Sequence, residues 1–250
     1  MKKEVLMQND HLILLSGKSK TGKSSSLESL KDDTGVIYLN CENGKKLPFK
    51  HTFSSQYYIV VTDPLQVYQA IEQAEARQDV HTIIIDTLTY LMDMYESMYV
   101  LTSSNTMKAW GDYAQFMKVL MSRYVASSTK NIIFLAHTSD ILNEAEMINE
   151  TFVKVKGSLM NQGVESFFTN VISTKKLALS ALPDDLAKSA MFTVTEDEEY
   201  LGFKHVYQTR VTKSTVNERI SSPKDMWAMN ETYIDNNIKY VIDRLQKYYG

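Results

Sequence analysis

Residues 17–24 combine glycines, lysines and hydroxyl side chains at a spacing suited to binding a polyphosphate. They read GKSKTGKS and match the pattern G-x-x-x-x-G-K-[ST] at every position. The glycines let the backbone curl so that its N–H groups point at phosphate oxygens, and a following helix adds its dipole. A surface turn that matches by chance is the alternative, and the apolar run directly before the motif argues against it.

The motif assigns chemistry to individual residues. Lys23 would reach the β- and γ-phosphates of ATP, and Ser24 would hold Mg²⁺. Asp86 ends the apolar run TIIID and is the expected second acid on the metal side, although an Asp there could instead cap the next element. The residues expected to contact the nucleotide are Gly17, Lys18, Ser19, Lys20, Thr21, Gly22, Lys23, Ser24 and Ser25.

Glu42 follows the apolar run VIYL within the sequence NCENG. Hydrolysis needs a carboxylate that orients water in line with the γ-phosphate. Because the carboxyl ends of parallel strands converge on one crevice, Glu42 is the candidate for this role. The alternative is a solvated turn residue beside Asn43 and Gly44, a pair that favours tight turns.

The elements that would position these residues are strands alternating with helices. The apolar runs are continuous, as in strands buried on both faces of a parallel sheet, and occupy residues 11–16, 35–40, 57–61, 82–87 and 131–136. Asp63, Pro64 and Gln66 predict a helix start, and a longer helix is expected over residues 107–126. We therefore expect an α/β fold with a mostly parallel central sheet flanked by helices.

Composition and length favour one globular domain over residues 1–250. The chain is 44% hydrophobic, carries a formal net charge of −3 and contains only Cys41 as cysteine, so a disulfide framework is excluded. No apolar run approaches the roughly 18 residues of a membrane span, and we expect a cytoplasmic protein. We expect a core over about residues 10–180 and a C-terminal extension over about 181–250, with two strands around the acidic run 196–199 and a helix over 234–249.

Several nucleotide-binding classes are disfavoured by what the sequence lacks. It has neither an N-K-x-D stretch for reading guanine nor an LSGGQ signature. An AAA-type ATPase usually has its catalytic Glu directly after the strand-end Asp, whereas Thr87 follows Asp86 here.

The arrangement resembles that of the RecA-like recombinases. Shared features are a phosphate-loop strand, Glu42 at the end of the next strand, and Asp86 followed by a hydroxyl residue. NIIFLAHT resembles their strand that ends in a γ-phosphate sensor, with His137 in place of the usual Gln; a buried, backbone-bonded histidine is the alternative. The likeness covers roughly residues 10–215 and is closest to short, core-only phage ATPases that act with single-strand annealing. It implies a RecA-like P-loop NTPase core with a C-terminal β-hairpin and helix.

The resemblance also implies sites for DNA and for a neighbouring subunit. Residues 101–108 and 138–156 resemble the two DNA loops, and the basic candidates of the second are Lys154 and Lys156. The stretch that begins VKGSLMNQG resembles the Gly-containing helix and strand that follow the second loop. Phe152 is the aromatic residue there that could stack on a base. Arg210 and Lys213, expected on a strand, resemble residues that reach the γ-phosphate of a neighbouring subunit; a solvated basic edge strand is the alternative.

The function expected from the sequence is a Mg²⁺-dependent, DNA-stimulated ATPase that acts in phage-type recombination or strand annealing, in the host cytoplasm if phage-encoded. Its expected partners are single-stranded DNA, a single-stranded-DNA-binding or annealing protein, and further copies of the chain. The alternatives are a ring-forming DNA motor, a nucleotide-binding regulator with little hydrolysis, and a small-molecule kinase.

Overall fold

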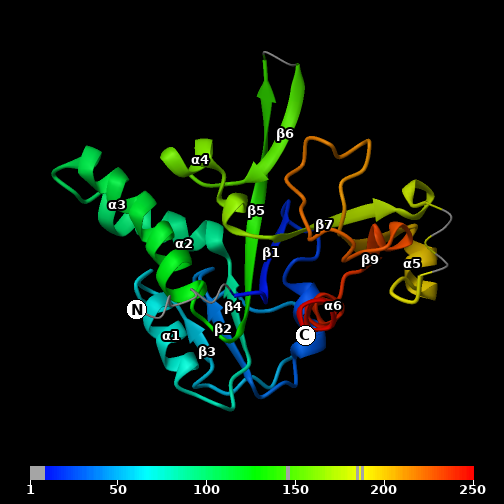
Figure 1. Cartoon of the computed structure of the whole chain (residues 1–250), viewed down its shortest axis with the longest axis horizontal. Coiled ribbons are helices and arrows are strands. Elements are labelled where there is room, and N and C mark those ends of the chain that lie inside the picture. The colour runs from blue at the N-terminus through cyan, green and yellow to red at the C-terminus, as the bar shows by residue number, and fades with distance from the viewer. Residues whose placement is uncertain (1–8, 145–146, 184–185, 187–188) are drawn as a thin grey trace, which may run out of the picture.

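A central β-sheet carries the apolar runs of the sequence and has helices on both of its faces (Figure 1). The structure is a computed structural model, and it describes residues 9–144, 147–183, 186 and 189–250. The strands are β1 (Leu12–Gly17), β2 (Val36–Asn40), β3 (Tyr58–Val60), β4 (Thr82–Asp86), β5 (Asn131–Asn143), β6 (Ile148–Val153), β7 (Asn170–Ala178), β8 (Phe203–Gln208) and β9 (Tyr233–Asp235).

The strand order is β3-β2-β4-β5-β1-β7-β8-β9, with β6 paired to the outer part of β5. Every pairing from β3 to β7 along this order is parallel, and β8 runs antiparallel to both β7 and β9. This is the mostly parallel α/β sheet that the continuous apolar runs predict. The phosphate-loop strand β1 and the Asp86 strand β4 are both neighbours of β5, so their carboxyl ends lie close together.

Alternate residues of each strand supply the two halves of the core. Leu14, Ile85 and Phe134 face one side, where they join a cluster with the buried faces of α1, α2 and α3. Ile13 and Ile84 face the other side and pack with η1 and α6. Figure 1 shows α1, α2 and α3 on one side of the sheet and α6 on the other. The strands are therefore buried on both faces, which is why their sequences lack polar alternation.

Two expected helices form close to where sequence signals place them, whereas the helix expected over 234–249 begins only at Ile238, because Tyr233–Asp235 form β9. Gln66 accepts a hydrogen bond from the N–H of Asp63, as the capping pattern predicts. The expected helix over 107–126 is present as α3 followed by the π-helical segment η3. The helical elements are η1 (Ser25–Leu30), α1 (Gln66–Glu75), α2 (Leu88–Tyr95), η2 (Glu96–Val100), α3 (Thr106–Val119), η3 (Leu120–Val125), α4 (Ser158–Gln162), η4 (Val164–Phe167), η5 (Leu179–Ala181), α5 (Glu196–Leu201), η7 (Met229–Glu231) and α6 (Ile238–Tyr249).

Much of the segment expected as a second DNA loop, residues 138–156, is a β-hairpin instead. β5 continues past the sheet to Asn143 and pairs antiparallel with β6, from Thr138 opposite Val153 to Asn143 opposite Ile148. Figure 1 shows this hairpin projecting from the body of the molecule. The strand pairing satisfies backbone groups that a loop would leave to water, and local composition did not reveal it.

The C-terminal part differs from the expected hairpin around an acidic turn. Thr195 caps a helix, α5, and forms a capping box with Glu198, so the acidic run lies in the first turn of a helix. Acidic side chains are favourable there because they complement the helix dipole. The antiparallel partner of β8 on its outer edge is β9, a short strand directly before α6. Both strands extend the central sheet.

Candidate functional site

The phosphate-binding loop leaves β1 and turns through two residues with positive φ, Lys20 at 63° and Gly22 at 96°. A Cβ at Gly22 would lie 2.7 Å from Nδ2 of Asn236, so this position needs glycine for space as well as for conformation. The Asn236 amide donates to the Gly22 carbonyl oxygen at 2.8 Å. The residues that precede α6 therefore pack against the phosphate loop and hydrogen-bond to it.

The side chain of Lys23 points back into this loop. Its Nζ donates to the carbonyl oxygens of Gly17 at 2.8 Å and of Lys18 at 2.7 Å. Burial lowers the pKa of Lys23 to about 8, although the charges of Asp86 and Glu42 favour its protonated form. Phosphate oxygens are stronger partners for an ammonium group than neutral carbonyls. A polyphosphate that binds here can therefore replace these carbonyl oxygens as the acceptor of the Lys23 ammonium group.

The carboxylate of Asp86 ends β4 beside Ser24. Ser24 Oγ donates to Asp86 Oδ2 at 3.1 Å, and the hydroxyl of buried Tyr38 donates to the same oxygen. Burial raises the pKa of Asp86, opposed by the hydrogen bond from Tyr38. Asp86 Oδ1 is buried without a hydrogen-bond partner among the described residues.

This oxygen set fits Mg²⁺. The ion prefers oxygen ligands and commonly binds one or two carboxylates together with substrate phosphates and water. Ser24 and the unpartnered oxygen of Asp86 would hold it, and the ion would supply charge neutralisation to bound phosphates. In the described part of the chain, no three His, Cys, Asp or Glu side chains cluster to bind a metal by themselves. The donor set therefore suits an ion that arrives with a nucleotide.

Glu42 lies on a tight turn that holds its side chain inside the site. The Asn40 side chain accepts from the N–H of Glu42 at 3.0 Å, and the turn continues through Asn43 and Gly44, both at positive φ. The Glu42 side chain is only 8% exposed, which argues against the solvated-turn alternative. Burial opposes its ionisation, but hydrogen bonds from His137 and Lys45 outweigh burial and the pKa of Glu42 lies below its usual value.

His137 ends the part of β5 that lies within the central sheet. Its Nε2 lies 3.3 Å from Glu42 Oε1, and its backbone N–H donates to the Thr89 hydroxyl at 2.9 Å. The rings of Tyr90 and His137 pack in a T-shaped arrangement, with the ring centres 5.8 Å apart. The sequence gives no sign that Thr89 or Tyr90 contacts His137. The structure also brings His137 and Glu42 into one site.

Glu42, Asp86, His137 and most of the predicted phosphate-loop residues line a pocket of about 320 Å³ at the carboxyl ends of the parallel strands. Its wall is Ser19, Lys20, Gly22, Lys23, Ser24, Ser25, Tyr38, Asn40, Glu42, Lys45, Lys46, Leu47, Pro48, Asp86 and His137. The other motif residues, Gly17, Lys18 and Thr21, line a neighbouring groove. The pocket offers cations and backbone N–H groups to a polyphosphate, and a carboxylate to a water molecule.

Some residues of the site were missed by sequence reasoning. The sequence pattern places Tyr38 in a strand and does not indicate its contact with Asp86. Asn236 and Thr174 lie far along the chain from the phosphate loop that they contact. No local signal marks such contacts. Lys45 is different, since a basic residue three positions after a candidate catalytic acid is visible in the sequence.

The two predicted DNA contacts, Lys154 and Lys156, differ in their partners. Lys156 Nζ is 2.5 Å from Glu96 and its side chain is half-exposed, whereas Lys154 is exposed at the base of the hairpin. Phe152 is buried and lies under the guanidinium of Arg219, so the suggestion that it stacks on a base is wrong.

Arg210 and Lys213 lie beyond the end of β8, so the expected basic strand is wrong there. The Arg210 guanidinium donates to the Trp227 carbonyl at 2.6 Å, and Arg210 lines a different pocket. Lys213 is exposed. The nucleotide pocket of the same chain includes neither residue.

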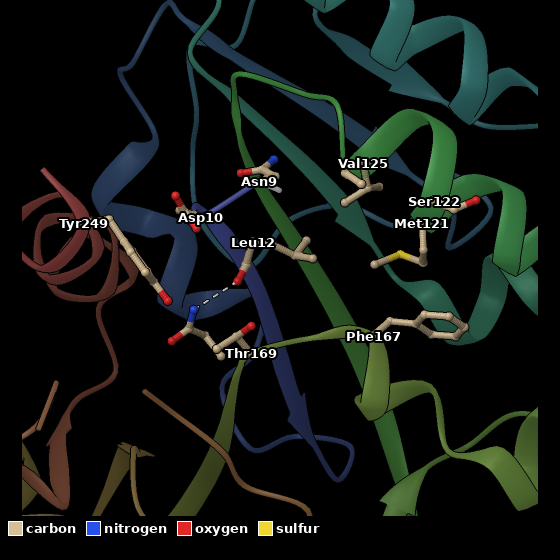
Figure 2. A pocket seen from close by; sticks show the side chains of 11 residues that line it. Asn9, Asp10, Leu12, Met121, Ser122, Val125, Phe167, Thr169 and Tyr249 are labelled. Carbon is tan, nitrogen blue, oxygen red and sulfur yellow. Dashed lines mark hydrogen bonds between the residues drawn. The ribbon is translucent and has the colours of Figure 1, made fainter. Parts of the chain in front are cut away.

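A further pocket lies at the opposite end of β1 from the phosphate loop (Figure 2). Its volume is about 160 Å³, and apolar side chains of Leu12, Met121, Val125 and Phe167 line it. Tyr249 reaches its rim from the end of α6. It is remote from the carboxylates and lysines described above and offers no comparable chemistry.

A phosphate loop after a parallel strand, with a buried Asp at the end of another, defines a P-loop NTPase. The family model AAA_24, an AAA domain, matches residues 10–175, and the chain belongs to this family. The family implies nucleotide use, typically with Mg²⁺, and an ATPase activity. Thr87 after Asp86 therefore does not exclude an AAA domain; its hydroxyl accepts from the Tyr90 N–H at the start of α2.

No curated protein matches the chain. None of the helices in the described ranges has the length and apolar character needed to cross a membrane.

Proposed function

We propose that this P-loop ATPase hydrolyses Mg²⁺–ATP with Glu42 as the water-orienting carboxylate, and that single-stranded DNA stimulates turnover in phage-type recombination or strand annealing. The observation that carries the hydrolytic part is the convergence of Glu42, Lys23 and Asp86 on one pocket. Three residues separated by up to 63 positions in the chain meet there, each with the chemistry that phosphoryl transfer to water needs.

Each residue has a distinct part in this proposal. Lys23 and the loop N–H groups bind the β- and γ-phosphates, and Ser24 and Asp86 hold the metal ion. Glu42 accepts a hydrogen bond from the attacking water, whose oxygen bonds to the γ-phosphorus as the bond to ADP breaks. The water proton passes towards Glu42 and then to the released phosphate. His137, now beside Glu42, would turn its ring N–H to the γ-phosphate when the triphosphate binds.

The DNA part rests on the RecA-like resemblance. The β5–β6 hairpin occupies the chain position of the second DNA loop, and Asp140 within it is 2.5 Å from Lys18 of the phosphate loop. This contact offers a route by which DNA on the hairpin alters the site. We propose Lys154 as a DNA contact, with Lys156 available if its pair with Glu96 opens.

The proposal includes assembly into a homo-oligomer on single-stranded DNA, with a single-stranded-DNA-binding or annealing protein as a further partner. Arg210 or Lys213 of one copy would then reach the γ-phosphate on the next. Arg210 would have to leave its bond to the Trp227 carbonyl, so Lys213, which is exposed, is the simpler choice.

The test is steady-state ATP hydrolysis with single-stranded DNA, with duplex DNA and without DNA. We expect stimulation by single strands alone, and Glu42→Gln should bind ATP normally while kcat falls about 10²–10⁴-fold. Normal hydrolysis by Glu42→Gln would contradict the role of Glu42. Turnover that ignores DNA would contradict the recombination part, and strand displacement would favour a DNA motor.

A nucleotide-dependent regulator is a second candidate. Both carboxylate oxygens of Glu42 are hydrogen-bonded, one to His137 and one to Lys45. These bonds lower the basicity of the carboxylate, so a chain that never releases Glu42 would bind ATP and turn it over slowly. ATP binding with negligible hydrolysis by the wild type, with or without DNA, would support this candidate.

A further inference from the structure

Lys45 is a cation at the rim of the nucleotide pocket that the nucleotide-binding motifs do not include. Its Nζ lies 2.6 Å from Oε2 of Glu42, and it lines the same pocket as Lys23 and Asp86. Its charge also acts on both of those groups, because it favours ionised Asp86 and disfavours protonated Lys23. Lys45 therefore belongs electrostatically to the site.

The backbone of Lys45 is fixed while its side chain is accessible. The Asn40 amide donates to the Lys45 carbonyl oxygen at 2.9 Å, and the Lys45 N–H donates to the Glu42 carbonyl at 3.0 Å. The Lys45 side chain is nevertheless 69% exposed. An ion pair with one exposed member is weak, so the ammonium can change partner without moving its backbone.

The present partner of Lys45 is the oxygen that catalysis needs. Glu42 Oε1 lies against His137 and Oε2 against Lys45, and these partners stabilise the carboxylate and make it a weaker acceptor for a proton from water. A terminal phosphate carries more negative charge than a carboxylate and offers several acceptor oxygens, so it competes well for an ammonium group.

Several cations line the wall of the pocket, and they differ in their partners. The wall residues all lie within the described ranges and include no arginine; their cations are Lys20, Lys23, Lys45 and Lys46. Of these, Lys45 is the one bonded to Glu42, the carboxylate proposed to face the attacking water.

We propose that Lys45 binds the γ-phosphate, and that the γ-phosphate thereby takes the ammonium group from Glu42 and frees Oε2 for the attacking water. This inference rests on the proposed role of Glu42. It makes the activation of water depend on a triphosphate, because ADP has no phosphate at the γ position to draw Lys45 away.

The experiment compares binding of a non-hydrolysable ATP analogue and of ADP, each with Mg²⁺, by calorimetry, together with kcat for ATP. Lys45→Met should weaken binding of the triphosphate about tenfold and of ADP less than about twofold, and should lower kcat about 10–100-fold. Lys45→Arg should restore most of the triphosphate affinity. Lys50→Met, which removes a charge from an exposed position of the same segment outside the pocket, should change neither quantity.

Two results would overturn the inference. One is an unchanged preference for triphosphate over ADP in Lys45→Met. The other is faster turnover in Lys45→Met, which would mean that Lys45 only restrains Glu42. Failure of the proposed function gives a different result: the wild type binds the analogue but does not hydrolyse ATP. The preference for the analogue over ADP can still be compared between wild type and Lys45→Met, and that comparison alone then decides whether Lys45 binds the γ-phosphate.

Discussion

At the scale of single residues, the two carboxylates of the pocket have different surroundings. Asp86 is almost completely enclosed and burial raises its pKa, whereas Glu42 is held in its charged form by His137 and Lys45. A buried oxygen without a partner suits a metal ion, and an ionised carboxylate suits a hydrogen bond from water. Environment, more than residue type, separates their proposed roles.

Tyr38→Phe tests the support of Asp86. The substitution removes the hydroxyl that donates to Asp86 Oδ2 and leaves a buried acceptor with Ser24 as its remaining donor. We expect the free energy of unfolding to fall by about 1–3 kcal/mol and ATP hydrolysis to need more Mg²⁺. Urea unfolding and a Mg²⁺ titration of activity measure the two effects.

Tyr58→Phe is the matched control for that prediction. The Tyr58 ring stacks on Tyr38 with ring centres 5.2 Å apart, but its hydroxyl bonds to Asn40. Its Mg²⁺ requirement should match that of the wild type. If the two variants shift the Mg²⁺ requirement equally, Tyr38 has no special connection with the metal side of the site.

The lowered pKa of Glu42 predicts a pH dependence of stability. A carboxyl group with a lower pKa in the folded state than in the unfolded state contributes stability above its unfolded pKa, and this contribution disappears as pH falls through the folded pKa. Glu42→Gln removes that contribution. The stability difference between wild type and Glu42→Gln, from urea unfolding, should therefore be larger at pH 7 than at pH 4. A constant difference would show that the ion pairs of Glu42 do not survive in solution.

At the scale of elements, an ion pair between Lys18 and Asp140 joins the β5–β6 hairpin to the phosphate loop. Lys18 and Asp140 are both solvent-accessible, and Thr151 of β6 also donates to Asp140. An exposed ion pair contributes little to stability. The ion pair instead helps to position Lys18, whose carbonyl oxygen accepts from the Lys23 ammonium group that a polyphosphate would bind.

Asp140→Asn should therefore uncouple the hairpin from nucleotide binding. In the wild type we expect ATP-analogue binding to change amide hydrogen exchange in the hairpin, and in Asp140→Asn this change should be much reduced while affinity shifts by less than about threefold. Glu150→Gln removes the same charge from the hairpin without contacting the phosphate loop, and it should behave as wild type. An undiminished exchange response in Asp140→Asn would contradict the coupling.

At the scale of the whole molecule, the C-terminal part completes the nucleotide site although the family match ends at residue 175. α6 buries Ile238, Val241, Ile242 and Leu245 in the core on the face of η1. The residues just before α6 bring Asn236 to the phosphate loop. Core packing and site geometry therefore depend on the same segment.

Asn236→Ala separates these two contributions. Loss of the hydrogen bond to the Gly22 carbonyl should loosen the phosphate loop and weaken ATP binding about 3–10-fold, with a loss of unfolding free energy of about 1 kcal/mol or less. The neighbouring Asn237 instead caps α6 by accepting from the Lys239 N–H. Asn237→Ala should cost about 1 kcal/mol of stability and leave ATP affinity unchanged. Equal affinities in the two variants would contradict the role of Asn236.

The sequence by itself determined the parts that depend on local pattern. Continuous apolar runs predict doubly buried parallel strands, and GKSKTGKS predicts a phosphate loop because its glycines and lysine have few other uses at that spacing. Glu42 and Asp86 could be placed near that loop because the carboxyl ends of parallel strands share one edge.

Only the tertiary structure decided the rest. The extension of β5 into a hairpin and the contacts of Tyr38 and Asn236 with the site depend on partners that the local pattern does not specify. Asn236 illustrates the point, since its amide donates to the carbonyl oxygen of Gly22, 214 positions earlier in the chain. Hydrogen bonds between residues distant in the chain form because the packed core brings those residues together. Local sequence does not specify which distant residues become neighbours.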